Sequence, residues 1–265
     1  MLMDKDEYLV IDANQYMRVC LFSTRGDRDE QQDCSGLLVD QEDGIVVICD
    51  GMGGHRGGRD ASNTAVRVVL NAFSGGDFTE NIEETFRSVI ADADYEISQN
   101  WDENGDPLRS GTTIVSVLVK KKNVFWVSAG DSRIYLMRGE EMIQITKDHT
   151  YELALKENLE AGMISRAFFE NQKPSAGALI SFLGIGGVPL IDSNHEPFRL
   201  LSGDKIILMS DGLYKYLSME MVKSITSGYV KSEDAVRILN EQTLMAAHAR
   251  GLKRDNMTVA IVDII

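Results

Sequence analysis

The chain has 265 residues, of which 43% are apolar and 26% charged, a composition typical of a soluble globular protein. Its formal net charge of −14 argues against nucleic acid or an anionic membrane as the main partner, because both are negatively charged themselves. No apolar run reaches membrane-spanning length, and the acidic N-terminus lacks the basic start of a signal peptide, so we expect a cytoplasmic protein.

Cysteine, glycine and proline usage bears on domain organisation. The three cysteines, Cys20, Cys34 and Cys49, lie in apolar, strand-like segments without C-x-x-C spacing, so we expect reduced and mostly buried thiols. Gly is frequent (23 residues) and Pro is rare (4 residues), which favours tight turns within one compact unit over Pro-rich linkers. We therefore predict a single domain over residues 1–265.

Apolar periodicity predicts strands first, then two helices, then further strands and helices. The second of these helices carries an apolar residue at almost every third or fourth position, which gives it one apolar face: Ile82, Phe86, Val89, Ile90, Ala93 and Ile97. The predicted strands cover residues 16–24, 34–40, 44–50, 112–120, 124–129, 133–137, 206–209 and 257–264. The predicted helices cover residues 59–73, 79–100, 150–161 and 232–249, the last with Ser232 as N-cap.

The order of these elements indicates the fold class. Strands occur in runs and helices occur in runs, without the strict alternation of a doubly wound parallel sheet. We therefore predict an α+β fold with layered antiparallel sheets. Residues 121–123 are expected to form a hairpin turn, and residues 162–197, the least regular stretch, are expected to form a mobile surface flap.

An aspartate follows the end of an apolar run at three places in the chain. Asp50 and Asp211 each precede a glycine, Asp131 precedes a serine, and a fourth aspartate, Asp255, stands before the final predicted strand. Any one Asp-Gly pair alone is typical of a hairpin turn. As a set, carboxylates at strand ends can meet at one sheet edge, where their repulsion favours a bound cation. Oxygen ligands suit Mg²⁺ or Mn²⁺.

Two further segments support a metal site that handles phosphate. The run Asp50-Gly-Met-Gly-Gly-His55 places three glycines, which let the backbone approach a ligand closely, before a histidine. Upstream, Arg28 stands five residues before Asp33. Arginine binds phosphate in bidentate fashion, and the carboxylate can join a metal shell. Taken alone, the segment 28–33 is also typical of a solvated charged turn.

Together these segments resemble the protein phosphatase 2C family, in its compact bacterial form. The resemblance runs from about Val19 to the C-terminus, and several short motifs in the family's order are more specific than any one of them. The motifs are Arg28-x-x-Gln-Gln-Asp33, Asp50-Gly-Met-Gly-Gly-His55, Ser110-Gly-Thr-Thr113, Gly130-Asp-Ser-Arg133, Lys147-Asp-His149, Ser210-Asp-Gly-Leu213 and Asp255-Asn256.

The resemblance implies a four-layer sandwich of two antiparallel sheets flanked by helices, with two divalent ions, Mn²⁺ or Mg²⁺, at one end. It implies that Asp50 bridges the ions and that the backbone carbonyl of Gly51 binds one of them. Asp211 and Asp255 would complete the ligands of the other ion. Asp33 would belong to the metal shell, directly or through water.

The implied reaction is hydrolysis of phosphoserine or phosphothreonine in proteins. A hydroxide that bridges the two ions attacks phosphorus directly, without a phosphoenzyme. Arg28 holds the phosphate, and His55 is the expected proton donor to the leaving oxygen because imidazole titrates near neutral pH. The implied partners are phosphorylated proteins and a Ser/Thr kinase that acts on the same targets, with no nucleic acid and no membrane.

Two positions depart from the family pattern. Asp131 matches a ligand of a third, weaker ion, but the place of its usual partner holds Lys215, whose ammonium repels a cation. We expect this third site to be weakened or absent, with Lys215 supplying part of its charge; equally, Lys215 could point into solvent. Gln32 stands where many members carry glutamate, a better ligand than an amide.

The remaining polar candidates are expected to have structural roles. His149 is expected to be structural, His195 and His248 to lie at the surface, and Arg133 to support the turn at Asp131 or to buttress the site. The chain has no HxH or HExxH spacing, so a zinc site is not expected.

Three other functions stay open. A phosphatase that controls an anti-sigma or anti-anti-sigma partner would usually carry sensory domains, and none is visible in the sequence. A binding module that has lost catalysis is disfavoured by the complete set of Arg28, Asp50, His55, Asp211 and Asp255. A phosphatase for small molecules is a third reading, because metal ions and arginine recognise phosphate whatever carries it.

Overall fold

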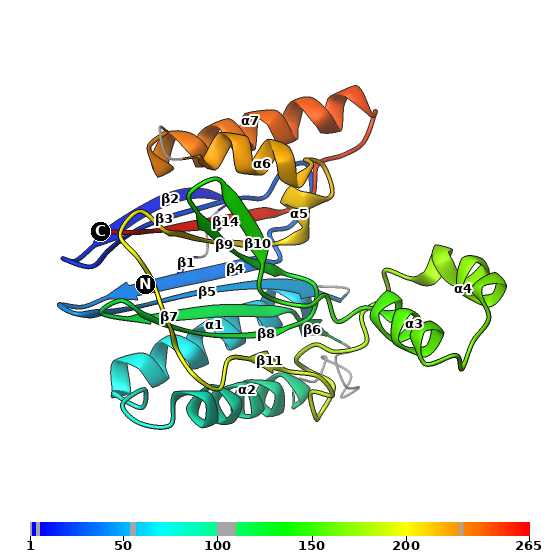
Figure 1. The fold of residues 1–265 in the computed structure, drawn as a ribbon, viewed down its shortest axis with the longest axis horizontal. Helices are drawn as coiled ribbons and strands as arrows, with labels where there is room; N and C mark the ends of the chain where they lie inside the picture. The colour runs from blue at the N-terminus through cyan, green and yellow to red at the C-terminus, as the bar shows by residue number, and fades with distance from the viewer. Residues whose placement is uncertain (1, 4–5, 54–56, 100–109, 228–229) are drawn as a thin grey trace.

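The computed structural model describes residues 2–3, 6–53, 57–99, 110–227 and 230–265 of the chain. Two antiparallel sheets lie face to face between layers of helices (Figure 1). Helices α1 (Gly57–Gly75) and α2 (Ile82–Ser98) cover one sheet, and α6 (Met219–Thr226) and α7 (Ser232–Ala249) cover the other. The prediction of an α+β sandwich with four layers is confirmed.

The first sheet has the strand order β1-β4-β5-β7-β8-β11, with two short strands beside this path, β6 on β5 and β12 on β8. Its strands are β1 (Leu2–Met3), β4 (Asp33–Val39), β5 (Asp43–Met52), β6 (Gly111–Thr112), β7 (Ile114–Lys120), β8 (Asn123–Ala129), β11 (Asp192–Ser193) and β12 (Phe198–Arg199). The predicted hairpin between β7 and β8 is present, since Lys120 pairs with Asn123 across it.

The second sheet has the strand order β10-β9-β13-β14-β3-β2. Its strands are β2 (Glu7–Ala13), β3 (Met17–Thr24), β9 (Arg133–Arg138), β10 (Glu141–Gln144), β13 (Lys205–Met209) and β14 (Met257–Ile264). The edge strands β2 and β10 escaped the sequence analysis. In β10 exposed and partly buried residues alternate and no residue is fully buried, so its apolar signal is weak. β2 contains an apolar run at residues 8–11, which the sequence analysis overlooked.

Three hydrophobic clusters hold the layers together. One lies between the first sheet and α1 and α2, the second lies between the two sheets, and the third joins the second sheet to α5 (Asp211–Tyr214), α6 and α7. The predicted apolar face of α2 is confirmed, because all six of its residues are buried in the first cluster. Cys20, Cys34 and Cys49 are buried thiols, as expected. Within the described part of the chain, no helix combines the length and apolar character needed to cross a membrane.

Residues 151–175 form a helical projection at one end of the sandwich (Figure 1). It consists of α3 (Tyr151–Glu160), α4 (Arg166–Gln172) and the short 3₁₀ helix η1 (Lys173–Ser175). The helix predicted at 150–161 is therefore present. The stretch 162–197 is more regular than expected, because it contains α4 and η1. Ser165 caps α4 by accepting a hydrogen bond from the Phe168 N–H at 3.2 Å. Its role as a flap stays a prediction.

The predicted N-cap of α7 is wrong. Lys231 occupies the cap position and Ser232 is the first helical residue. The Ser232 hydroxyl donates a hydrogen bond to Asp263 Oδ2 at 2.6 Å, on the neighbouring strand β14. The Ser232 hydroxyl is therefore used in a tertiary contact and does not cap the main-chain N–H groups of the first turn of α7.

Several strand ends gather at one end of the sandwich. β4 begins where β5 ends, because Asp33 lies opposite Asp50, and β14 begins where β3 ends, because Met257 lies opposite Thr24. β13 ends at the same level, with Met209 opposite Val259. Residues just before or just after these strands are therefore brought together from distant parts of the chain.

Candidate metal and catalytic site

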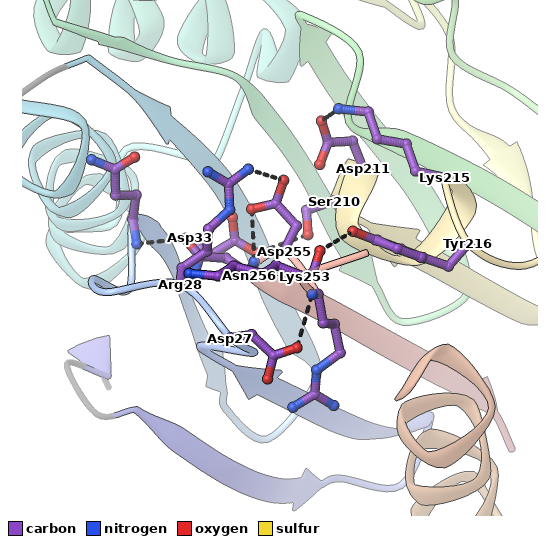
Figure 2. A network of polar contacts seen from close by, with 12 residues as sticks. Asp27, Arg28, Asp33, Ser210, Asp211, Lys215, Tyr216, Lys253, Asp255 and Asn256 are labelled. Atoms are coloured by element: carbon purple, nitrogen blue, oxygen red, sulfur yellow. Dashed lines mark hydrogen bonds and ion pairs between the residues drawn. The ribbon is translucent and has the colours of Figure 1, made fainter. Parts of the chain in front are cut away.

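The aspartates at the strand ends lie together. Asp33 is the first residue of β4 and pairs in register with Asp50 of β5. Asp211 is the first residue of α5, separated from the end of β13 by Ser210, and Asp255 stands just before β14. Figure 2 shows Asp211 and Asp255 at neighbouring strand ends, and both line a pocket of about 450 Å³ together with Asp50. Asp50 lies inside a strand and Asp211 opens a helix, so neither occupies a hairpin turn.

Asp33 is a buried carboxylate with one satisfied and one unsatisfied oxygen. Its Oδ2 accepts hydrogen bonds from the hydroxyls of Ser210 at 2.8 Å and Thr258 at 2.7 Å. Its Oδ1 is buried and has no hydrogen-bond partner among the described residues. The pKa of Asp33 is raised to about 7, chiefly by burial and in part by the charges of Asp211 and Asp255, against the effect of the two hydroxyls. A buried oxygen without a donor suits a bound cation.

Asp50 is surrounded by negative charge. Burial raises its pKa well above the usual value, and the charges of Asp33 and Asp211 add to this. Its main chain is fixed by β6 and the residue after it. The Asp50 N–H donates to Thr113 Oγ1 at 3.0 Å, and the Asp50 carbonyl accepts from the Thr113 N–H at 2.9 Å and from Thr112 Oγ1 at 3.0 Å.

Gly51 has no room for a side chain. An added Cβ would lie 2.1 Å from the carbonyl oxygen of Gly58 in α1 and 2.6 Å from that of Gln32. The Gly51 N–H donates to the Gln32 carbonyl at 3.1 Å. Glycine is therefore required here for the close approach of β5, α1 and the β3–β4 loop.

Among the residues that the structure describes, two cationic side chains bind this carboxylate cluster (Figure 2). Arg28 donates from its guanidinium to Asp255 Oδ2 at 2.6 Å, and the Lys215 ammonium is paired with Asp211 one turn earlier on α5. Burial lowers the pKa of Lys215, but the charge of Asp211, the hydrogen bond to Asp211 and the charges of Asp131 and Asp50 together outweigh burial, so the pKa is raised. Lys215 thus points to Asp211, although its side chain stays half exposed.

These ion pairs affect how the cluster can bind a metal. In this conformation, no three His, Cys, Asp or Glu side chains of the described residues lie close enough together to hold one ion. A cation that binds at Asp211 or Asp255 must therefore compete with Lys215 or Arg28.

Asn256 fixes the loop that carries Arg28. Its side-chain Nδ2 donates to the carbonyls of Arg25 at 2.8 Å and Glu30 at 3.0 Å, and its Oδ1 accepts from the Gln32 N–H at 2.9 Å. Asn256 appeared in the sequence motif without a role, and so did Ser210. Thr258 was missed altogether, although a polar residue within an apolar strand was an available signal.

Asp131 lies beside the cluster and is supported by aromatic and basic residues. Burial raises its pKa, and the charge of Asp211 adds to the effect. The Tyr214 hydroxyl donates to the Asp131 carbonyl at 3.0 Å, and the Arg133 guanidinium lies 3.6 Å from the centre of the Tyr214 ring. Arg133 also forms an ion pair with Asp148 at 2.6 Å. Arg133 therefore supports the Asp131 turn through Tyr214, a residue that the sequence analysis missed.

The four histidines have different surroundings. His55, the expected proton donor, lies outside the described residues. His149 is buried, and its Nδ1 accepts a hydrogen bond from the Gly130 N–H at 3.3 Å, in keeping with a structural role. His195 and His248 are exposed, as expected.

Comparison with known proteins identifies the family. The family model described as Protein phosphatase 2C matches residues 8–155, more than half of the chain. The chain belongs to the protein phosphatase 2C family. It is 31% identical over 241 residues to the serine/threonine phosphatase stp of Listeria monocytogenes, which covers 89% of this chain and 91% of that relative. The expected membership is confirmed, and the protein is a serine/threonine protein phosphatase of the bacterial type.

Solved structures of other phosphatases share the fold. The serine/threonine phosphatase of Staphylococcus aureus aligns with a TM-score of 0.75 at 26% identity, covering 93% of this chain and 94% of its own. The catalytic domain of the phosphatase PstP, solved in complex with 2 manganese ions, aligns with a TM-score of 0.72 at 24% identity, covering 94% and 99%. At this identity the second comparison shows the fold alone.

Proposed function

We propose that this phosphatase of the 2C family hydrolyses phosphoserine and phosphothreonine in proteins by direct attack of a hydroxide that bridges two Mn²⁺ or Mg²⁺ ions. The observation that carries the proposal is the cluster of Asp33, Asp50, Asp211 and Asp255, in which burial, and then the charges of the neighbouring carboxylates, raise the pKa of Asp33 and Asp50. Cations bound between these carboxylates would relieve the repulsion. The PstP catalytic domain, which has the same fold, is described with 2 manganese ions.

The donor atoms fit hard divalent cations. Asp33 Oδ1 is buried and lacks a hydrogen-bond donor within the described ranges, and every candidate ligand is an oxygen. The proposed ligands are Asp50 between the ions, the carbonyl of Gly51, Asp211 and Asp255, with Asp33 direct or through water. Bound ions of this kind lower the pKa of water enough to provide a nucleophile near neutral pH.

The other proposed roles belong to Arg28 and His55. Arg28 is held at the rim of the pocket by Asp255, and a cation at Asp255 would compete for that carboxylate and release the guanidinium. The freed guanidinium can then bind two phosphoryl oxygens and offset their charge. His55 is proposed to protonate the leaving serine or threonine oxygen.

Lys215 supports the proposal that the third ion is weak or absent. Its ammonium neutralises Asp211, and its pKa is raised in part by the charge of Asp131, so it lies near both carboxylates. A cation next to Asp131 would meet this positive charge. Lys215 would then supply part of the charge of the third ion.

The helical projection of α3 and α4 is proposed to influence which phosphoproteins bind. It extends beyond the sandwich and contains part of the proposed flap, residues 162–197 (Figure 1). Two of its side chains, Met163 and Phe168, are exposed apolar residues that a peptide could contact. A Ser/Thr kinase that phosphorylates the same targets is the expected counterpart.

Asp211→Asn tests the proposed function. The variant should lose most Mn²⁺ binding in calorimetry and most phosphate release, while Asp92→Asn, an exposed aspartate on α2, should retain both. Release of p-nitrophenol from p-nitrophenyl phosphate with Mn²⁺, and its loss with EDTA, separates an enzyme from a binding module. Hydrolysis of a phosphothreonine peptide in preference to a nucleotide supports a protein substrate, and the reverse order contradicts it.

A further inference from the structure

Helix α2 carries a buried carboxylate that the proposed reaction does not use. Asp94 is only 4% exposed. Its Oδ1 accepts hydrogen bonds from the N–H groups of Gly184 at 2.7 Å, Ile185 at 3.1 Å and Gly186 at 3.3 Å, and its Oδ2 accepts from the Gly187 N–H at 2.6 Å. Four successive main-chain donors thus enclose one side chain, an arrangement that binds anions tightly.

The loop around Asp94 has a backbone that only glycine adopts readily. Gly184, Gly186 and Gly187 have φ values of +106°, +76° and +137°. These values turn successive N–H groups toward the same point. The loop is also pressed against its surroundings, because an added Cβ at Gly184 would lie 2.5 Å from the Ser110 carbonyl oxygen. The position of the loop therefore depends on both its glycines and the Asp94 carboxylate.

The residue before this loop is linked to the proposed metal site. Leu183 pairs with Thr112 through two hydrogen bonds, from the Leu183 N–H at 2.9 Å and from the Thr112 N–H at 3.0 Å. Thr112 in turn lies opposite Gly51 in strand register, and its hydroxyl donates to the Asp50 carbonyl at 3.0 Å. Hydrogen bonds on either side of the Leu183–Gly184 peptide bond thus connect Asp94 to the Asp50–Gly51 segment.

We propose that Asp94 is a positioning residue for the metal site: it holds the Gly184–Gly187 loop so that Leu183 and Thr112 keep Asp50 and Gly51 in the geometry that binds the ions. The loop follows the helical projection in the chain and precedes β11. This inference rests on the proposed function, because it assumes that Asp50 and Gly51 are ligands. Partners that orient metal ligands from behind typically affect metal affinity by about 10- to 100-fold.

Asp94→Asn tests the proposal. The amide keeps the size of the side chain but replaces one acceptor oxygen with an N–H donor, which faces the main-chain N–H groups and repels them. We expect Mn²⁺ affinity, measured by calorimetry on the full chain, to fall by roughly tenfold, the lower end of the range for such partners. The KM for p-nitrophenyl phosphate at saturating Mn²⁺ should change little. Asp92→Asn, two residues away on the exposed side of the same helix, is the matched control and should bind Mn²⁺ like the wild type.

A second pair of variants covers the case in which Asp94→Asn does not fold. Gly186 and Gly203 both have positive φ, and an added Cβ would meet nothing within 4 Å at either position. Alanine should strain each loop about equally, but only Gly186 belongs to the Asp94 loop. Gly186→Ala should therefore weaken Mn²⁺ binding several-fold, whereas Gly203→Ala should not.

The outcomes separate this proposal from the proposed function. Unchanged Mn²⁺ affinity in Asp94→Asn or in Gly186→Ala would overturn the positioning role, and so would an equal loss in Gly203→Ala, which would indicate general destabilisation. If the wild-type protein itself binds no Mn²⁺, the proposed function fails instead.

Discussion

The buried carboxylate of Asp33 leads to a prediction about the stability of the metal-free protein. The ordinary pKa of an aspartate is 3.8, and burial raises that of Asp33 to about 7 in the folded chain. The folded protein therefore keeps a proton that the unfolded chain loses as the pH rises from about 4 to about 7. Over this window the folded state loses stability relative to the unfolded state, and below it the contribution of Asp33 is fully retained.

The magnitude follows from the size of the shift. Each pKa unit corresponds to about 1.4 kcal/mol, so a shift of about three units amounts to roughly 4 kcal/mol, lost across the whole window. Between about pH 5 and about pH 7.5 the loss should be roughly 2–3 kcal/mol. Asp33→Asn removes the ionisable group, and its carbonyl can still accept from Ser210 and Thr258. The variant should therefore lack this part of the pH dependence.

Urea denaturation in EDTA, near pH 5 and near pH 7.5, measures the effect. The wild type should lose more stability than Asp33→Asn across this interval, and the exposed control Asp92→Asn should behave like the wild type. With saturating Mn²⁺ near pH 7.5, the wild type should be more stable than Asp33→Asn, because the bound ions stabilise the ionised carboxylate. Equal loss of stability in the wild type and in Asp33→Asn, without metal, would refute the reasoning.

Three other substitutions probe the same site. Lys215→Asp should create a third Mn²⁺ site, seen as a higher Mn²⁺ stoichiometry in calorimetry. If the variant binds the same number of ions as the wild type and needs the same Mn²⁺ concentration for activity, the proposed role of Lys215 is contradicted. Arg28→Ala should lower kcat/KM by about 10- to 100-fold, because the phosphate loses its charge-assisted hydrogen bonding to the guanidinium. The same change should tighten Mn²⁺ binding, because the ion no longer competes with Arg28 for Asp255, and weaker Mn²⁺ binding would argue against that competition. Gly51→Ala should destabilise the protein by about 1–3 kcal/mol or more in urea denaturation, since its Cβ would collide with the main chain of Gly58, and wild-type stability would disprove the close approach.

The sequence predicted the central strands and the long helices because their apolar patterns are strong. The stripe on α2 and the run 44–50 in β5 correspond to buried faces in the structure. Asp50, Asp131 and Asp211 were found for the same reason, since each follows the end of an apolar run, and Asp255 was found because it stands before one. Their proximity then follows from strand register, as with Asp33 opposite Asp50.

Other features depend on contacts between distant residues and could not be read from a local pattern. Ser232 looked like a helix cap, but Asp263, 31 residues away, binds its hydroxyl. The pairing of Arg28 with Asp255 joins residues 227 positions apart. The Asp94 loop contains three glycines that appear in sequence only as an irregular stretch, and their function becomes visible once α2 lies beside them.

The four clustered aspartates come from both halves of the sandwich. Asp33 and Asp50 belong to strands of the first sheet, whereas Asp211 and Asp255 flank β13 and β14 of the second. Ions coordinated by all four carboxylates would link the two sheets to each other. Removal of the ions by a chelator should therefore destabilise the carboxylate end of the sandwich first. Amide hydrogen exchange would then quicken at the starts of β4 and β14 while the opposite end of each strand stays protected.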